Sequence, residues 1–205
     1  MESTLFYHLR KLPNQLTAIR FVAVPVMWVY AVLGARTYIG VGFIIGLVTD
    51  LLDGAAARKL NQTSDFGSKF DSLADQFLQI SSIIWVLMLM PEIFTENLLV
   101  SLLALGTYLT SLTVGLIKFR RMANLHLYLS KVGGLFLYLF LIHAFMVGQY
   151  SQVLFVIAGV LFIFSSLETL ILQLTSSEVY ADTGSIFLRY IREDHPIRYY
   201  LSRLP

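Results

Sequence analysis

The sequence predicts an all-α integral membrane protein, with six transmembrane helices, an amino-terminal interfacial helix and a cytoplasmic tail. Hydrophobic residues make up 57% of the chain and charged residues 14%, which is a more apolar balance than soluble domains have. Six apolar segments are also long enough, or nearly so, to cross a bilayer as helices. We place these spans near residues 14–34, 38–58, 66–90, 97–118, 131–149 and 151–174.

The first twelve residues predict a short helix that lies in the membrane interface. Their apolar side chains can face lipid while the basic ones meet headgroups, so we assign residues 1–12 to this helix. Pro13 is expected to end it, because proline lacks the backbone N–H that a continuing helix needs. Asn14 would then cap the first span. No small-residue cleavage site is evident, which favours a retained span over a signal peptide.

The second and third spans are the least apolar, because acidic residues lie near the connection between them. They qualify as spans only if these ends lie at the membrane surface or in a polar cavity. Ser64, in the connection, is expected to cap the third span. We predict a membrane domain over residues 1–174, with its six spans within 14–174. The tail over residues 175–205 is rich in charged and aromatic residues and is expected to lie against the surface.

Basic residues collect at one set of span ends, and they predict the orientation of the chain. On that side lie Arg10, Lys11, Arg58, Lys59, Lys69, Lys118, Arg120, Arg121 and Lys131, with further arginines in the tail. The opposite connections hold Arg36 as their one basic residue. Cytoplasmic loops carry the excess of lysine and arginine, so both termini and the second connection should face the cytoplasm of a multi-pass cell-membrane protein. Anionic lipid explains these charges better than nucleic acid does.

Four aspartates near the second connection lie in or beside apolar segments, where an unpaired charge is costly and usually marks function. On helices, Asp50 and Asp53 are three residues apart, while Asp71 and Asp75 are four apart. Each pair therefore faces one way, and two neighbouring helices would aim all four carboxylates at one point. Converging anions repel unless cations neutralise them, and carboxylate oxygens suit hard ions such as Mg²⁺ or Mn²⁺.

Small residues and an arginine follow the first pair of aspartates. Gly54 and Ala57 leave one face of the helix clear, so that a ligand or another helix can approach closely. Arg58, one turn after Gly54, supplies a cation whose fork geometry matches phosphate oxygens. Metal ions, an arginine and a cleared helix face together indicate a diphosphate-binding site.

The stretch from Asp50 to Asp75 resembles the signature of the CDP-alcohol phosphotransferase family, D-x2-D-G-x2-A-R-x8-G-x3-D-x3-D. Every fixed position is matched, by Asp50, Asp53, Gly54, Ala57, Arg58, Gly67, Asp71 and Asp75. A pattern of this length is far more specific than a short motif. The resemblance implies transfer of a phosphatidyl group from a CDP-linked lipid, most commonly CDP-diacylglycerol, to a polar alcohol acceptor, with release of CMP. It also implies two divalent cations, Mg²⁺ or Mn²⁺, and a homodimer.

The resemblance assigns roles to the matched positions. The metal ligands would be Asp50, Asp53, Asp71 and Asp75. Asp75 would also be the catalytic base that accepts the proton of the acceptor hydroxyl. The residues that bind the CDP moiety would be Asp50, Asp53, Gly54, Ala57, Arg58, Gly67 and Asp71.

The run PNQLTAIR at residues 13–20 resembles the start of phosphatidylglycerophosphate synthases within this family. That resemblance favours glycerol 3-phosphate as the acceptor, with inositol phosphate, inositol and serine as the alternatives. Thr17 and Arg20 follow at helical spacing and would face the signature residues if the resemblance holds. Alternatively, Arg20 snorkels to the membrane surface, with its stem along the apolar helix and its charge in water.

A basic cluster outside the signature has two interpretations. Its members are Lys118, Arg120, Arg121 and Lys131, beside the fourth and fifth spans. If these residues fold over the metal site, they would hold an anionic acceptor. Alternatively, they follow the positive-inside bias and touch lipid headgroups.

Two other classes of protein place aspartates inside a membrane. An intramembrane prenyltransferase holds a diphosphate through Mg²⁺, but its aspartate-rich motifs lack the small residues and the arginine found here; turnover of prenyl diphosphate would identify it. A divalent-cation transporter would not need Arg58, which would repel the transported ion; metal uptake into vesicles would identify it. The specificity of the signature favours the transferase over both.

Overall fold

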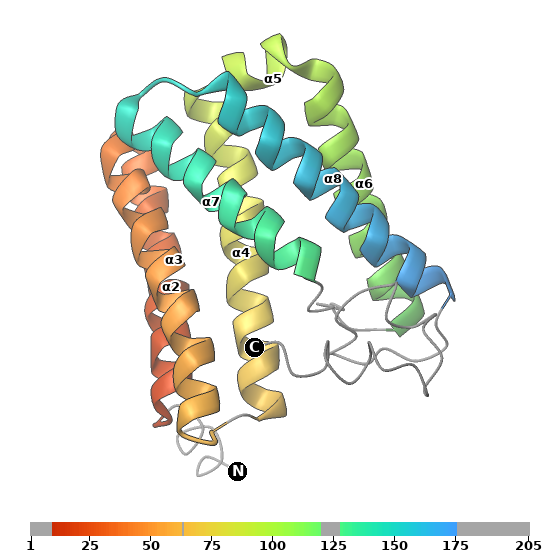
Figure 1. The fold of residues 1–205 in the computed structure, drawn as a ribbon. Coiled ribbons are helices and arrows are strands. Elements are labelled where there is room, and N and C mark those ends of the chain that lie inside the picture. Colours follow the sequence, from red (N-terminus) through yellow and green to blue (C-terminus); the bar gives the residue numbers. More distant parts are fainter. Residues whose placement is uncertain (1–9, 63, 120–127, 176–205) are drawn as a thin grey trace. The chain divides into compact units, whose positions relative to one another are not determined.

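A computed structural model describes residues 10–62, 64–119 and 128–175 of the chain. The helices in these ranges follow one another along the sequence (Figure 1) as α2 (Leu12–Val32), α3 (Arg36–Lys59), α4 (Asp65–Leu89), α5 (Glu92–Glu96), α6 (Leu98–Phe119), α7 (Tyr128–Val147) and α8 (Gln152–Thr175). The described part of the chain contains no strand. Most of the expected interfacial helix, and the tail from residue 176 onward, lie outside the described residues.

Six of these helices are long and apolar enough to cross a membrane, as the sequence predicted. They are α2, α3, α4, α6, α7 and α8. Their composition follows from the bilayer, because about 20 mainly apolar residues are needed to span its hydrocarbon core. The short helix α5 was not predicted; it lies in the connection between the third and fourth spans.

Two glycines end helices earlier than the sequence analysis placed them. Gly34 has a φ of +69° and Gly148 a φ of +75°, a left-handed conformation that glycine adopts without steric cost and that stops an α-helix. Consequently α2 ends at Val32 and α7 at Val147, two residues before the predicted ends of those spans. At its other end, α7 begins at Tyr128 rather than at residue 131.

The predicted start of the first span was wrong. Lys11 is the N-cap of α2, Leu12 is its first residue, and Pro13 lies in its first turn. Proline fits there because the N–H groups of the first turn have no partner within the helix. Asn14 is therefore a buried helical residue and not a cap. The cap predicted at Ser64 is confirmed, since its Oγ accepts a hydrogen bond of 3.1 Å from the Gly67 N–H.

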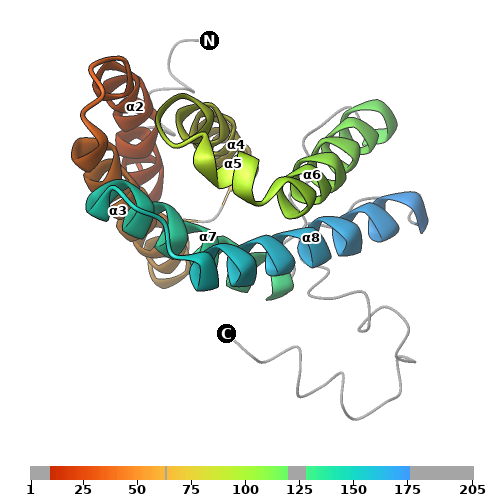
Figure 2. The same cartoon turned by 90° about the horizontal axis from the view of Figure 1, so that it is seen from above.

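The chain divides into two compact units. The first comprises residues 1–98 and 138–155, and the second comprises residues 99–137 and 156–205. In the first unit α2 packs against both α3 and α4 (Figure 2). The indole N–H of Trp28 on α2 donates to the Ser81 hydroxyl on α4 at 3.0 Å, which helps to fix the register of these two helices.

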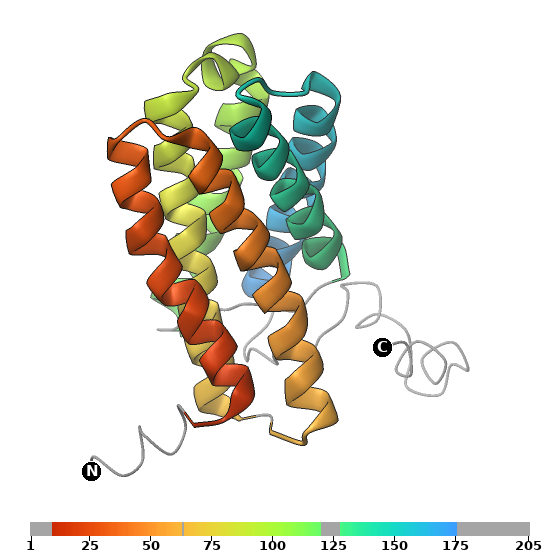
Figure 3. The same ribbon diagram turned by 90° about the vertical axis from the view of Figure 1, so that its left-hand side faces the viewer.

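A glycine on α3 makes room for a side chain of α2. A Cβ placed on Gly42 would lie 2.5 Å from the sulfur of Met27, and small residues permit such close packing between membrane helices. Figure 3 shows these two helices side by side. The next residue, fully buried Phe43, packs its ring against Trp85 and Phe145, with ring centroids 5.9 and 5.7 Å apart. The first half of α2 is thereby held beside the end of α3 that carries two of the aspartates.

In the second unit, α6 and α7 each contact α8. The hydroxyl of Ser111 on α6 lies 3.5 Å from the amide oxygen of Gln173 on α8. Gly133 on α7 faces the backbone of α8, where an added Cβ would meet the Leu161 carbonyl oxygen at 3.4 Å. These small and polar contacts are typical of helix pairs inside a membrane.

Candidate active site

The four signature aspartates converge on one arginine in the first unit. Helix α2 supplies Arg20, α3 supplies Asp50 and Asp53, and α4 supplies Asp71 and Asp75. The Nη2 atom of Arg20 lies 3.3 Å from Asp50 Oδ1 and 2.9 Å from Asp53 Oδ2. Its Nη1 atom lies 3.0 Å from Asp71 Oδ1 and also donates to Asp75. One guanidinium therefore joins the two helical pairs that the spacing predicted.

Burial decreases across this cluster. The Arg20 side chain is 1% exposed and that of Asp53 is 8% exposed, whereas Asp71, Asp50 and Asp75 are 27–37% exposed. A buried charge requires a paired partner, and the guanidinium and the carboxylates supply each other with one. The cluster thus has a closed side at Asp53 and an accessible side at the other three carboxylates, from which a ligand can enter.

Thr17 orients the most buried carboxylate. It lies one turn before Arg20 on α2, and its hydroxyl donates to Asp53 Oδ2 at 3.1 Å. The same hydroxyl oxygen is 3.2 Å from the carbonyl oxygen of Pro13. Asp53 Oδ2 consequently accepts from both Thr17 and Arg20, which fixes the direction of this carboxylate within the site.

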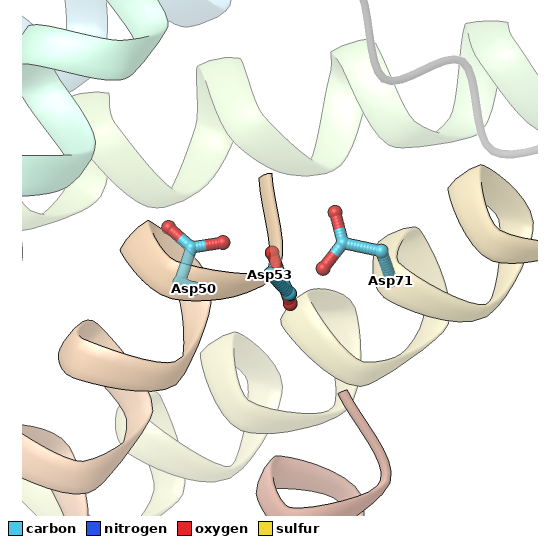
Figure 4. Close-up of side chains that lie close together, drawn as sticks. All are labelled: Asp50, Asp53 and Asp71. Carbon is cyan, nitrogen blue, oxygen red and sulfur yellow. The ribbon is translucent and has the colours of Figure 1, made fainter. Parts of the chain in front are cut away.

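Three of the carboxylates are arranged as a metal ion would need them. One oxygen from each of Asp50, Asp53 and Asp71 lies within 4.8 Å of the others, and Figure 4 shows these side chains pointing toward one another from α3 and α4. An all-oxygen, anionic donor set fits a hard divalent cation such as Mg²⁺ or Mn²⁺. Asp75 is not in this group of three, but it is joined to it through Arg20.

Gly67 allows α2 and α4 to approach closely next to the site. A Cβ at this position would lie 2.8 Å from Asn14 Oδ1 and 3.2 Å from Ser64 Oγ. Asn14 is buried with 3% exposure, and the Ser64 oxygen is engaged in capping α4, so neither group can move aside freely. A packing requirement therefore explains this signature glycine, alongside the ligand-binding role that the resemblance implies.

The other signature positions lie on the last two turns of α3. Gly54 and Ala57 are half-buried, while Arg58 is exposed. The nearest atom to a Cβ at Gly54 would be Arg58 Nη1, at 3.7 Å. Among the described residues, no other element comes within 4 Å of a Cβ at Gly54, and Arg58 is positioned beside this face of the helix.

The basic cluster is described only in part. Arg120 and Arg121 lie outside the described residues, and Lys131 is exposed in the first turn of α7. The Nζ atom of Lys118 donates to the carbonyl oxygens of Gln173 and Leu174 at 2.7 and 3.0 Å. A cation at a helix C-terminus is stabilising, so Lys118 has a structural partner in the last turn of α8.

Two site residues, Thr17 and Arg20, are not identified by the signature alone. The alternative that Arg20 snorkels to the membrane surface was wrong, because its side chain is almost completely buried among carboxylates. The signal for it was its spacing from Thr17 within the PNQLTAIR run, which places both side chains on one face of α2. That face is the one turned to the aspartates.

Clustered carboxylates in a chain with six helices apolar enough to cross a membrane are typical of membrane enzymes that bind a divalent ion, and comparison with known sequences identifies the family. A family model described as CDP-alcohol phosphatidyltransferase matches residues 10–177. The chain therefore belongs to the CDP-alcohol phosphatidyltransferase family, whose members are transferases. No solved structure shows a significant match to the chain.

Curated relatives match a shorter part of the sequence. A CDP-diacylglycerol–glycerol-3-phosphate 3-phosphatidyltransferase of Rickettsia typhi is 36% identical over 73 residues, which cover 34% of this chain and 41% of the relative. A protein of the same name from Wigglesworthia glossinidia brevipalpis is 35% identical over 79 residues, covering 37% and 43%. Another, from Blochmanniella floridana, is 27% identical over 108 residues, covering 47% and 57%. The chain thus spans about half or less of the length of these relatives.

Proposed function

We propose that this protein transfers a phosphatidyl group from a CDP-linked lipid to an alcohol and releases CMP. The observation that carries this proposal is the convergence of Asp50, Asp53, Asp71 and Asp75 on one site in a chain of the CDP-alcohol phosphatidyltransferase family. CDP-diacylglycerol as donor and glycerol 3-phosphate as acceptor are supported by the names of the relatives.

Two divalent cations, Mg²⁺ or Mn²⁺, would occupy this site. Asp50, Asp53 and Asp71 would hold them with clustered oxygens, and Asp75 would complete the set from the next turn of α4. When bound, such ions neutralise the charge that develops on a diphosphate during phosphoryl transfer.

The protein's own residues bind the donor and orient it. Gly54 and Ala57 would leave room for the donor on this helix face, and exposed Arg58 offers a guanidinium to the diphosphate. The close packing at Gly67 keeps the start of α4 against α2, which also contacts α3. The cytidine end of the donor would therefore lie against the last turns of α3.

Asp75 is suited to act as the base. Its side chain is 37% exposed, so an acceptor hydroxyl can reach it, and a carboxylate within hydrogen-bond distance can accept the hydroxyl proton. The hydroxyl oxygen then forms a bond to the lipid-side phosphorus. The bond from that phosphorus to the CMP oxygen breaks, and CMP leaves with the electron pair.

The acceptor would be held by the basic cluster. Lys131 is exposed, so an acceptor phosphate could reach it, and Lys118, Arg120 and Arg121 would contribute further positive charge. A charge-assisted contact of this kind suits glycerol 3-phosphate better than an uncharged alcohol.

The protein would act in a cell membrane, as a homodimer embedded in the lipid bilayer. The six apolar helices support a multi-pass protein. The excess of basic residues near the second connection supports an active site that opens to the cytoplasm, with both termini on the same side.

CMP release by the purified protein in detergent tests the reaction. CDP-diacylglycerol and Mn²⁺ or Mg²⁺ are supplied, and glycerol 3-phosphate, inositol phosphate, inositol and serine are offered separately, with the lipid product identified by mass. We expect release that depends on glycerol 3-phosphate and yields phosphatidylglycerophosphate. Release with another acceptor alone would contradict the acceptor assignment, and no release with any acceptor would contradict the reaction class.

A further inference from the structure

Arg20 contacts all three carboxylates that could hold a cation together. Its Nη2 atom reaches Asp50 and Asp53, and its Nη1 atom reaches Asp71. These are the same side chains whose oxygens lie within 4.8 Å of one another. The guanidinium and a divalent ion would therefore draw on one set of oxygen atoms.

We propose that Arg20 occupies the cation site of the metal-free protein, and that a divalent ion binds by displacing its guanidinium from some of the carboxylates. This proposal rests on the metal site of the proposed function, and it adds a competitor that is part of the chain itself. Arg20 is then a positioning residue that keeps the aspartates ordered before the ion arrives and lowers the affinity of the site for that ion.

The charges require such a residue. Four carboxylates from two helices repel one another when they all contact a single guanidinium group. Asp53 is too buried for water to screen this repulsion. Arg20 offers the opposing charge from a third helix, with a side chain that is 1% exposed. Arginine remains protonated in proteins, so the site contains this positive charge whether or not a metal ion is bound.

The bonding of the guanidinium fits a group that changes partners. Its two terminal nitrogens serve one helix each, Nη2 for α3 and Nη1 for α4. The buried Nε atom has no hydrogen-bond partner among the described residues. An unpaired buried donor is unfavourable. A shift of the guanidinium that gave Nε a hydrogen-bond partner would therefore recover part of the energy lost when Arg20 releases a carboxylate. Thr17 keeps Asp53 in place independently of the arginine.

Mn²⁺ binding without substrate tests the competition. The purified full-length protein, Arg20→Gln and the control Arg36→Gln are titrated with Mn²⁺ by calorimetry, and thermal unfolding is followed with and without the ion. The control removes an arginine from the opposite end of α3. We expect Arg20→Gln to bind Mn²⁺ at least about tenfold more tightly than the wild type. Its unfolding temperature should be lower without Mn²⁺ and rise more on adding it, while Arg36→Gln should match the wild type.

Equal or weaker Mn²⁺ binding by folded Arg20→Gln would overturn the proposal, because Arg20 would then only help to build the metal site. If that variant does not fold, Arg20→Lys replaces it. A lysine keeps the charge but cannot bridge both helical pairs with a planar fork, so it should bind Mn²⁺ more tightly than the wild type by a smaller factor; unchanged or weaker binding would again be contrary. A protein that passes this test but releases no CMP would contradict only the proposed reaction.

Discussion

The polar groups at the two ends of α4 differ in burial and in charge pairing. Near its start, Asp71 and Asp75 meet a buried arginine. Beyond its last residue, α5 and the connection before α8 form an exposed hydrogen-bond network. There the Tyr150 hydroxyl donates to Glu96, and Asn97 Nδ2 donates to the Tyr150 oxygen at 3.1 Å. Residue 71 and the end of α4 are about 27 Å apart along the helix, at about 1.5 Å per residue.

The two ends differ in what their polar groups can contribute: exposed hydrogen bonds at one end and buried charges at the other. Exposed hydrogen bonds compete with water and contribute little, so the network at Glu96 and Tyr150 only joins two connections. Buried ionised groups are costly unless paired, and the aspartates of the other end could be replaced by apolar residues if packing were their sole purpose. We therefore propose that the charged end of α4 is the functional one, and substitutions at the two ends should differ accordingly.

Changing an acid to its amide at each end should have the most unequal outcome. Asp71→Asn removes a carboxylate that contacts Arg20 and lies in the group of three oxygens. We expect a loss of about a thousandfold or more in CMP release, because Asp71 would hold a cation that neutralises the charge developing during the transfer. Glu96→Gln is the matched control at the other end and should stay within about twofold of the wild type. Full activity in a folded Asp71→Asn protein would remove this residue from the site.

Adding a methyl group at Gly67 should disturb the packing of the charged end. The new Cβ would lie 2.8 Å from Asn14 Oδ1, so we expect Gly67→Ala to lower the free energy of unfolding by about 1–3 kcal/mol. Denaturation in mixed micelles measures this value.

Asn14→Ala removes the atom that the new methyl group would strike. In the double variant, part of the loss caused by Gly67→Ala should therefore be recovered. If the loss in the double variant equals the sum of the losses in the two single variants, these residues are not in contact. Gly106→Ala is a second control, because a Cβ there would meet nothing within 4 Å.

Removing the Thr17 hydroxyl should have a smaller effect. Thr17→Val keeps the shape of the side chain but loses the 3.1 Å hydrogen bond to Asp53, while Arg20 still contacts that carboxylate. We expect a loss of about 1 kcal/mol in the free energy of unfolding. The control is Thr107→Val, whose exposed hydroxyl donates to its own helix at Leu103. Equal losses in both variants would mean that the contact with Asp53 is not stabilising.

The smallest effect is expected in the basic cluster. Lys131 is exposed, so Lys131→Ala should raise KM for glycerol 3-phosphate by roughly fivefold, as an exposed charge pair allows. The KM for CDP-diacylglycerol should not change. Steady-state kinetics with each substrate varied in turn separates the two constants. An unchanged KM for glycerol 3-phosphate would leave this lysine with the role that membrane topology gives it.

Much of the charged end could be predicted from the sequence, because it depends on local spacing. The pairs Asp50/Asp53 and Asp71/Asp75 are set by helical periodicity, and the cap at Ser64 by the chemistry of the first turn. The six spans follow from composition and length. These features do not require knowledge of which helices are neighbours.

The rest depended on tertiary contacts or on backbone conformation. An arginine near a helix end can reach the surface or turn inward, and only the position of α3 and α4 beside α2 decides between these for Arg20. Glycine permits helix continuation as well as a left-handed residue, so Gly34 and Gly148 did not reveal the ends of α2 and α7. Pro13 was compatible both with a break and with a first turn, and the structure has the latter.

We propose that the aspartate cluster formed by the end of α3 and the start of α4 is a metal-dependent transferase site. Its most direct test is CMP release from CDP-diacylglycerol by the wild-type protein with glycerol 3-phosphate, measured with Mn²⁺ and again after chelation with EDTA. We predict release that requires both the acceptor and the divalent ion and that returns when Mn²⁺ is restored. Acceptor-dependent release that continues unchanged in EDTA would contradict the claim.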